Sequence, residues 1–199
     1  MTQFVRSDPS LLEELSNHSA AVIGDAMDRF NVLDARIQST WAGARITGSA
    51  FTVWTRAGDN MAIHAALEVT KPGDVLVVNG FGEENRALIG EMIGIKAKAR
   101  GLAGFVLDGA ARDIAELADL DMPVFARSVT PAGPYKFGPY KLALPIACGG
   151  VCVHPGDAVL ADGDGVAIVP RADLEATLRD ADAIVENEKL KRINNAVPR

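Results

Sequence analysis

The sequence contains few cysteine, histidine and aromatic residues. Among 199 residues there are 2 cysteines and 3 histidines, and aromatic residues make up 6%. Cys148 and Cys152 form a C-x3-C pair, which matches neither a zinc knuckle nor a thioredoxin-type motif, so we expect two free, buried thiols. His18, His64 and His154 are scattered without an H-x3-H spacing, which argues against a histidine-based zinc site. We interpret His64, on an expected helix, as a partly buried structural residue.

Long apolar runs and an excess of positive charge are also missing. No run reaches the roughly 18 residues of a membrane span, and the first 15 residues are polar and acidic, unlike a signal peptide. The chain has 20 Lys and Arg against 26 Asp and Glu, a net charge of −6. This balance argues against a nucleic-acid-binding surface. We therefore expect a cytoplasmic protein that acts on neither membranes nor nucleic acids.

Several nucleotide, phosphate and calcium motifs are absent. The stretch GFGEEN at 80–85 ends in Asn85, where a dinucleotide fingerprint needs glycine. No Walker lysine motif and no G-x-S-x-G is present. The DGDG stretch at 162–165 would place Leu160 and Arg171 where a calcium loop needs carboxylates. We expect a hairpin turn there instead.

The length and composition indicate one globular domain over residues 1–199. The chain is 48% hydrophobic and 23% charged, values that are typical of a protein with a sizeable core. Strand and helix patterns alternate through the middle of the chain, and a β-meander follows, which predicts an α/β fold. We expect helices over 10–30, 58–70, 85–100, 113–120 and 172–195, strands over 43–55, 75–78, 103–108 and 122–128, an irregular segment over 130–145, and the meander over 150–170.

A strong cation and a carboxylate, Arg112 and Asp113, stand side by side just past an expected buried strand. Asp113 and Glu116 have the spacing of a capping box, in which Asp113 would begin a helix and Arg112 would be an exposed loop cation. Alternatively, the carboxyl end of a strand in an α/β sheet presents loop residues to a binding crevice. There Asp113 could hold a divalent cation and Arg112 could neutralise an anion or a developing oxyanion. The two interpretations are compatible.

A second carboxylate, Glu91, follows Gly90 in the stretch ALIGEMIG. Two glycines within five residues, Gly90 and Gly94, are unfavourable inside a helix, which suggests that the helix begins near residue 90 with 85–89 in the preceding loop. Both glycines would let ligand or backbone approach closely. The amides of Glu91 and Met92 would then form an anion-binding helix N-terminus. Such a site would suit a small keto acid and a metal ion.

At these residues the chain resembles the RraA-like family. The resemblance covers about residues 20–190 and rests on GDNMAIHAALEVTKPGDVLVVNGFG, ALIGEMIGIKAKARGLAGFVLDGAARD and GDAVLADGDGVAIVP. Its most specific element is Gly90-Glu91 followed about twenty residues later by Arg112-Asp113. The family includes the 4-hydroxy-4-methyl-2-oxoglutarate and 4-carboxy-4-hydroxy-2-oxoadipate aldolases.

The resemblance implies a layered, swivelling β/β/α fold in homotrimers or homohexamers, with sites between subunits. It implies class II aldolase chemistry, in which Mg²⁺ or Mn²⁺ binds the pyruvate half of the substrate. Asp113 matches the direct metal ligand, Glu91 a carboxylate that holds metal-bound water, Arg112 the residue at the keto oxygen, and the Met92 amide, beside Gly90, a contact to the pyruvate carboxylate.

The family pattern also includes a glutamate from a neighbouring subunit's C-terminal helix. Glu188 is our candidate for that residue and Glu186 its rival, both reaching metal-bound water. We therefore expect the C-terminal helix, about 172–195, to pack on a neighbouring subunit.

The resemblance thus predicts a lyase that cleaves a 4-hydroxy-2-oxo diacid to pyruvate and a second oxo acid, with oxaloacetate decarboxylation as a side activity. The alternative is a protein-binding regulator of the ribonuclease E inhibitor type. That branch is expected to lack the metal-binding aspartate, so Asp113 favours the enzyme. Some members carry a menaquinone methyltransferase label, but the sequence has no glycine-rich S-adenosylmethionine loop after an early strand.

Overall fold

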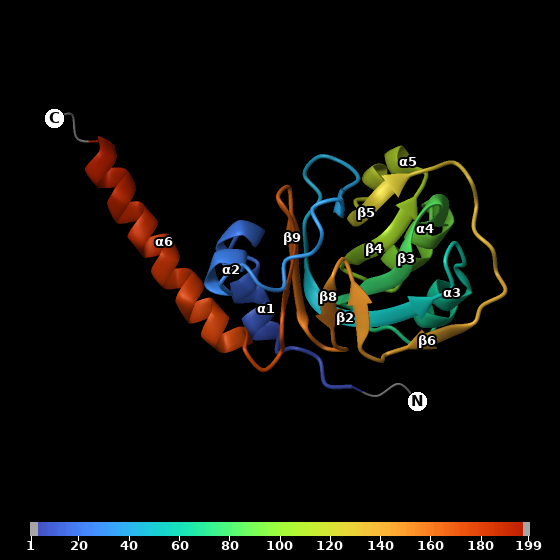
Figure 1. The fold of residues 1–199 in the computed structure, drawn as a ribbon, viewed down its shortest axis with the longest axis horizontal. Helices are drawn as coiled ribbons and strands as arrows, with labels where there is room; N and C mark the ends of the chain where they lie inside the picture. The colour runs from blue at the N-terminus through green and yellow to red at the C-terminus, as the bar shows by residue number, and fades with distance from the viewer. Residues whose placement is uncertain (1–3, 197–199) are drawn as a thin grey trace.

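The computed structural model describes residues 4–196, and its centre is one mixed eight-stranded sheet (Figure 1). Seven strands follow the order β1-β5-β4-β3-β2-β9-β10, and β6 pairs with the end of β2. Neighbours among β2, β3, β4 and β5 are parallel, while the other pairings are antiparallel. The strands are β1 (Gln38–Ser39), β2 (Ile46–Thr55), β3 (Asp74–Ile89), β4 (Gly104–Ala111), β5 (Val124–Val129), β6 (Tyr140–Leu142), β9 (Ala158–Asp162) and β10 (Gly165–Val169).

Three short helices cover one face of the parallel strands. They are α3 (Met61–Leu67), α4 (Glu91–Ala99) and α5 (Ile114–Asp119), and each connects one parallel strand to the next. All eight residues of β4 are buried, as expected for a parallel strand that is covered on both faces. The core between this face and the helices contains Phe51, Leu76, Phe105 and Leu107.

A two-stranded hairpin covers the opposite face. It consists of β7 (Ile146–Cys148) and β8 (Val151–Val153). Ile146, Cys148 and Val153 share a second core with strand residues such as Val77 and Val106, which point away from the helices. The layers are therefore hairpin, sheet and helices, which agrees with the predicted α/β fold and its β/β/α layering.

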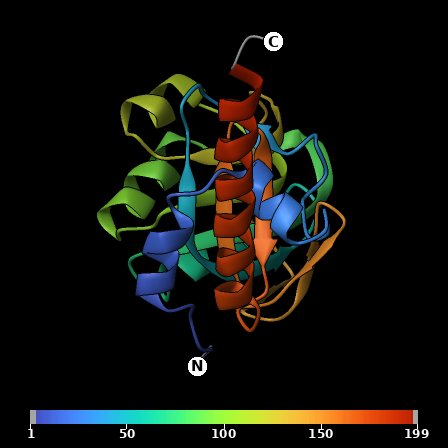
Figure 2. The ribbon, with the colours of Figure 1, turned by 90° about the vertical axis from the view of Figure 1, so that its left-hand side faces the viewer.

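A third core lies at the β9–β10 end of the sheet. There α1 (Pro9–Leu15), α2 (Ala20–Ala26) and α6 (Leu174–Ala196) gather over the two strands, and Figure 2 shows α6 crossing the front of this face. Leu174, Leu178 and Ala181 attach the first half of α6 to this core. Further along the helix, Leu190 and Ile193 are exposed.

The structure corrects several sequence-based expectations. The prediction of a single helix over 10–30 is wrong. The first helix ends with α1, and a second helix, α2, begins where the Ser19 side chain accepts a hydrogen bond from Val22 N. The helix over 85–100 is also wrong in its first turn, because β3 continues to Ile89 and α4 begins at Glu91. A helix start near residue 90 is thus confirmed, but 85–89 is strand and not loop. The irregular segment contains β6.

Other expectations have mixed outcomes. The turn at 162–165 is confirmed, because it joins β9 to β10 in antiparallel register. Cys148 is buried as expected, and burial raises the pKa of its thiol above the ordinary value, whereas Cys152 is exposed. Across residues 4–196, no helix has the length and apolar character needed to cross a membrane.

Candidate functional site

The carboxyl ends of β3 and β4, two adjacent parallel strands, form the centre of the candidate site. Arg112 N donates a hydrogen bond to Ile89 O at 3.1 Å, so the segment leaving β4 is fixed beside the segment leaving β3. Gly90 and Glu91 follow β3, and Arg112 and Asp113 follow β4. The two motifs that the sequence separates by about twenty residues therefore meet at one edge of the sheet, as parallel pairing requires.

Asp113 does not act as the predicted capping box. It occupies the N-cap position of α5, but its backbone is left-handed, with φ of 55°, and its side chain makes no cap hydrogen bond. Its Oδ2 instead accepts a hydrogen bond from Glu91 N at 3.0 Å and lies 3.5 Å from Arg112 Nε. The left-handed turn directs the carboxylate to the N-terminus of α4, where it satisfies a backbone donor that the helix leaves free.

Gly90 makes this approach possible. A Cβ atom at this position would overlap with the Asp113 carboxylate and would lie 3.0 Å from Arg112 Cγ. The close approach predicted for Gly90 is therefore made by a side chain of the protein. At Gly94 a Cβ would meet Leu117 Cδ2, so that glycine allows α4 to pack on α5 and does not face a ligand.

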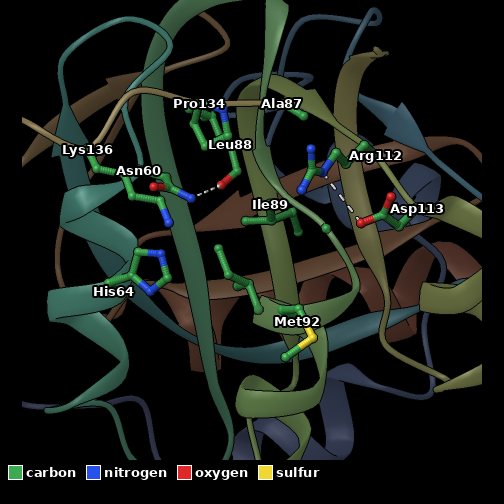
Figure 3. A pocket seen from close by; sticks show the side chains of 12 residues that line it. Asn60, His64, Ala87, Leu88, Ile89, Met92, Arg112, Asp113, Pro134 and Lys136 are labelled. Atoms are coloured by element: carbon green, nitrogen blue, oxygen red, sulfur yellow. Dashed lines mark hydrogen bonds and ion pairs between the residues drawn. The ribbon is translucent and has the colours of Figure 1, made fainter. Parts of the chain in front are cut away.

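A pocket of about 190 Å³ opens beside these residues (Figure 3). Gly90, Met92, Arg112 and Asp113 form one side of it, and the last residues of β3 form its floor. The side chains of Arg112 and Asp113 are 43% and 38% exposed, so solvent and ligands reach both. Four of the residues singled out in the sequence thus share one cavity.

The opposite wall consists of Asn60, His64 and Lys136, none of which was predicted from the sequence to belong to the site. His64 is half-buried, as predicted, but it lines the pocket. Burial lowers the pKa of His64 below its ordinary value, and the charges of Lys136 and Lys96 lower it further. The imidazole is therefore neutral near pH 7. Lys136 comes from the irregular segment, whose path no sequence pattern indicates.

The two other predicted carboxylates lie outside this pocket. Glu91 begins α4 but is not among the lining residues. Glu188 is on α6, which lies at the other end of the molecule from α3 and α4 (Figure 1), and it pairs with Arg192 at 3.1 Å. Glu186 is on the same helix and pairs with Lys189. Neither glutamate of α6 completes the pocket within one chain.

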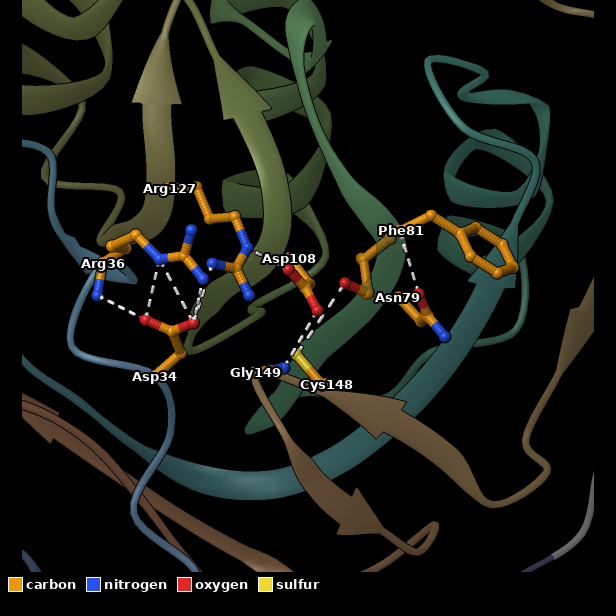
Figure 4. Close-up of polar contacts among 9 residues, drawn as sticks. Asp34, Arg36, Asn79, Phe81, Asp108, Arg127, Cys148 and Gly149 are labelled. Atoms are coloured by element: carbon orange, nitrogen blue, oxygen red, sulfur yellow. Dashed lines mark hydrogen bonds and ion pairs between the residues drawn. The ribbon is translucent and has the colours of Figure 1, made fainter.

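A second polar cluster lies on the hairpin side of the sheet (Figure 4). Arg127 forms ion pairs with Asp108 and, at 3.0 Å, with Asp34, and the Arg127 side chain is only 8% exposed. Asp108 Oδ2 also accepts a hydrogen bond from Gly149 N at 2.9 Å. Arg36 and Arg127 hold the pKa of Asp34 well below its ordinary value. These contacts join β4, β5, the hairpin turn and the loop before β1, which indicates a structural role.

Comparisons with known proteins give several relatives of this chain. The family model described as "RraA-like: Aldolase/RraA" matches residues 20–168. A protein of Halalkalibacterium halodurans, named "Putative 4-hydroxy-4-methyl-2-oxoglutarate aldolase", is 39% identical over 159 residues, which are 80% of this chain and 76% of that one.

Solved structures with the same fold carry different names. Streptomyces coelicolor RraAS2, described as an unusual member of the RNase ES inhibitor RraA protein family, is 30% identical, covers 95% of this chain and 100% of its own, and has a TM-score of 0.87. A Geobacillus kaustophilus protein named S-adenosylmethionine:2-dimethylmenaquinone methyltransferase is 34% identical, with 77% and 95% covered and a TM-score of 0.71.

Proposed function

Because the chain belongs to the RraA-like family, we propose that it is a divalent-metal-dependent carbon–carbon lyase that cleaves a 4-hydroxy-2-oxo diacid to pyruvate and a second oxo acid. The observation that carries this proposal is the meeting of Arg112, Asp113 and the N-terminus of α4 in one accessible pocket. The aldolase name of the Halalkalibacterium halodurans relative supports it.

The residues present fit a hard divalent cation such as Mg²⁺ or Mn²⁺. Asp113 offers a half-exposed carboxylate whose Oδ2 is fixed by the Glu91 amide. Mg²⁺ is usually held by one or two protein carboxylates and completes its shell with water and substrate oxygens. In the part of the chain that the structure describes, no three His, Cys, Asp or Glu side chains gather as a metal site; under this proposal water and substrate oxygens would complete the shell around Asp113. When bound there, the cation would supply positive charge to the oxo and carboxylate oxygens of the pyruvate half.

Arg112 can meet the negative charge that develops during the reaction. In retro-aldol cleavage the C3–C4 bond breaks, the C4 hydroxyl passes its proton to water and becomes an oxo group, and the electron pair passes to C3 and the C2 oxygen. Protonation at C3 then gives pyruvate. We assign Arg112 to the developing negative charge on the C2 oxygen, because a fixed guanidinium in the pocket is preorganised for it. Decarboxylation of oxaloacetate breaks the corresponding bond and develops the same charge, which is why we propose it as a side activity.

Glu188 can join such a site only from another copy of the chain, because α6 lies at the far end of the molecule from the pocket. We therefore propose a homotrimer or homohexamer in which the second half of α6 packs on a neighbour. Light scattering tests the assembly, and Glu188→Gln tests the glutamate, with Glu175→Gln on the same helix as the control. An active monomer would refute the shared site.

Turnover with and without a divalent cation tests the proposed function. Hydroxy-oxo diacids and oxaloacetate are offered to the protein with Mg²⁺, with Mn²⁺, and after treatment with EDTA. We expect pyruvate to form only with a divalent cation. If no hydroxy-oxo diacid or oxaloacetate is converted under any of these conditions, the proposed lyase activity is refuted. Inhibition of a ribonuclease, which the description of the Streptomyces coelicolor relative names, then becomes the function to test.

A further inference from the structure

Asn60, in the wall opposite Arg112, has an unusual hydrogen-bonding state. Only 4% of the surface of Asn60 is exposed, yet its Oδ1 has no hydrogen-bond partner. Among the side chains that the structure describes, this oxygen is the one buried polar atom without a partner. Buried polar atoms are nearly always paired, because an unpaired one loses its water without compensation. The Asn60 oxygen, in a residue that lines the pocket, can therefore accept one hydrogen bond from a donor that the described chain does not supply.

The orientation of the Asn60 amide is fixed by its other end. Asn60 Nδ2 donates to Leu88 O at 3.0 Å, and a backbone carbonyl can only accept. Turning the amide over would place two acceptors against each other, so the assignment of oxygen and nitrogen is secure. In Figure 3 the oxygen points away from Leu88, to the side of the pocket where Lys136 lies.

The charges around this oxygen select the kind of donor that it can receive. Lys136 is in the same wall and Arg112 is across the pocket. These two cations disfavour an ammonium group on the ligand and favour carboxylates. A neutral donor on an anionic ligand is then required, and an alcohol hydroxyl meets that requirement.

The segment that carries Lys136 is hydrogen-bonded to the two residues that precede α3. Asp59, the residue before Asn60, is fully buried, and its Oδ2 accepts hydrogen bonds from Phe137 N at 2.6 Å and Gly138 N at 3.0 Å. Asn60 N donates to Tyr135 O at 3.0 Å. The backbone around Lys136 is therefore fixed on both sides, and its exposed side chain leaves the chain next to Asn60.

We propose that Asn60 and Lys136 form the subsite for the half of the substrate that does not become pyruvate. Asn60 Oδ1 accepts a hydrogen bond from the C4 hydroxyl, and Lys136 pairs with the distal carboxylate. The inference rests on the proposed function and deepens it, because it assigns the preference for hydroxy-oxo diacids to residues outside the Arg112 and Asp113 wall.

Aldol cleavage and oxaloacetate decarboxylation should depend on this subsite to different extents. Oxaloacetate has a carboxylate at C4 and no hydroxyl, so it brings an acceptor where Asn60 Oδ1 requires a donor. A site that is built to bond a hydroxyl strongly rejects a compound that lacks it, because its own polar group stays unpaired. Removing the Asn60 oxygen should therefore impair aldol cleavage and spare decarboxylation.

Asn60→Leu, which keeps the approximate size of the side chain and removes the amide, tests the first contact. We expect kcat/KM for a 4-hydroxy-2-oxo diacid to fall at least tenfold, while kcat/KM for oxaloacetate is unchanged or rises. Met61→Leu, on the next residue of the chain, is the matched control and should change neither reaction. If Asn60→Leu does not fold, Asn60→Ser replaces it, because serine is favoured at the N-cap position that Asn60 occupies.

Lys136→Met tests the second contact, with Lys141→Met, at an exposed position of β6, as the control. We expect Lys136→Met to raise KM for the diacid at least tenfold and to leave KM for a 4-hydroxy-2-oxo monoacid unchanged.

The outcomes separate this inference from the proposed function. Equal losses of both reactions in the Asn60 variant would show a merely structural role and overturn the hydroxyl contact. Equal KM changes for diacid and monoacid would overturn the carboxylate contact. A wild-type protein without either reaction would refute the lyase itself, and the subsite with it.

Discussion

The carboxylate of Asp113 accepts a hydrogen bond from the backbone N–H of Glu91, which lies 22 residues earlier in the chain. This contact joins the segments that leave two parallel strands, and it fixes one carboxylate oxygen. The residue that we propose as the metal ligand therefore also organises the site. Substitutions must separate these two roles.

Asp113→Asn separates them. The asparagine oxygen can still accept from Glu91 N, so we expect a melting temperature close to that of the wild type. It lacks the charge that a hard cation needs, so turnover with Mg²⁺ should be lost. Asp119→Asn, on the exposed side of α5, is the control for activity and for thermal unfolding. An Asp113→Asn protein with wild-type turnover would exclude Asp113 as the metal ligand.

Arg112 is expected to act on the transition state more than on stability. Losing one preorganised donor costs on the order of 10²–10³ in kcat, whereas an exposed loop cation would change stability by no more than about 0.5 kcal/mol. We expect Arg112→Lys to lower kcat at least tenfold, since lysine lacks the planar fork, and Arg112→Ala to lower it further. Steady-state kinetics measures both, with Arg179→Lys on α6 as the control. Full activity of the Arg112→Ala variant would show that Arg112 is an exposed loop cation without a role in the reaction.

Gly90→Ala should damage the site through sterics alone. Its Cβ would overlap with the Asp113 carboxylate, so Asp113 or the start of α4 must move. Because small displacements of catalytic groups are costly, we expect kcat to fall by about 10²-fold. Gly163→Ala is the matched control, since a Cβ at Gly163 meets no atom within 4 Å. Equal activity of the two variants would contradict the close packing of Gly90 against Asp113.

Arg127→Met should destabilise the fold without changing the activity of each folded molecule. It leaves Asp108 buried without its partner, which typically costs about 3–5 kcal/mol. Urea unfolding should show that loss, and activity per folded molecule should be close to the wild-type value. Arg36→Met is the control, because the Arg36 side chain is 69% exposed and its loss should cost far less. An unchanged midpoint for Arg127→Met would contradict the structural role of the cluster.

The central fold was predictable because its signals are local. Apolar strand patterns, the Asp-Gly turn at 162–165 and the alternation with helices indicated an α/β sheet, and parallel order then brought Arg112 and Asp113 near Gly90. The N-terminal helices were misjudged because apolar spacing continues through the break at 16–19, where Ser19 begins a new helix.

The second wall of the pocket was not predictable. His64 has the spacing of an ordinary helical core residue, and Lys136 lies in a segment rich in proline and glycine whose path is set by Asp59. The capping-box spacing at Asp113 was misleading, because the left-handed backbone at that residue directs the carboxylate to a different helix. Long-range contacts determine where the side chains of His64, Lys136 and Asp113 lie, and such contacts leave no periodic pattern in the sequence.

The pairing of the sheet limits how copies of this chain can associate. The edge of β2 that faces away from β3 is covered along its length, by β9 at its start and β6 at its end. β1 has two residues, and residues 31–33 bond to β10 through Leu33 N to Val166 O and Ile168 N to Asn31 O. Over residues 4–196 the main sheet therefore offers no long, unpaired strand edge to another copy, and edge-to-edge β pairing is disfavoured. Assembly through helix surfaces and side chains is the route that this fold leaves open, and the same arrangement guards the protein against aggregation by strand addition.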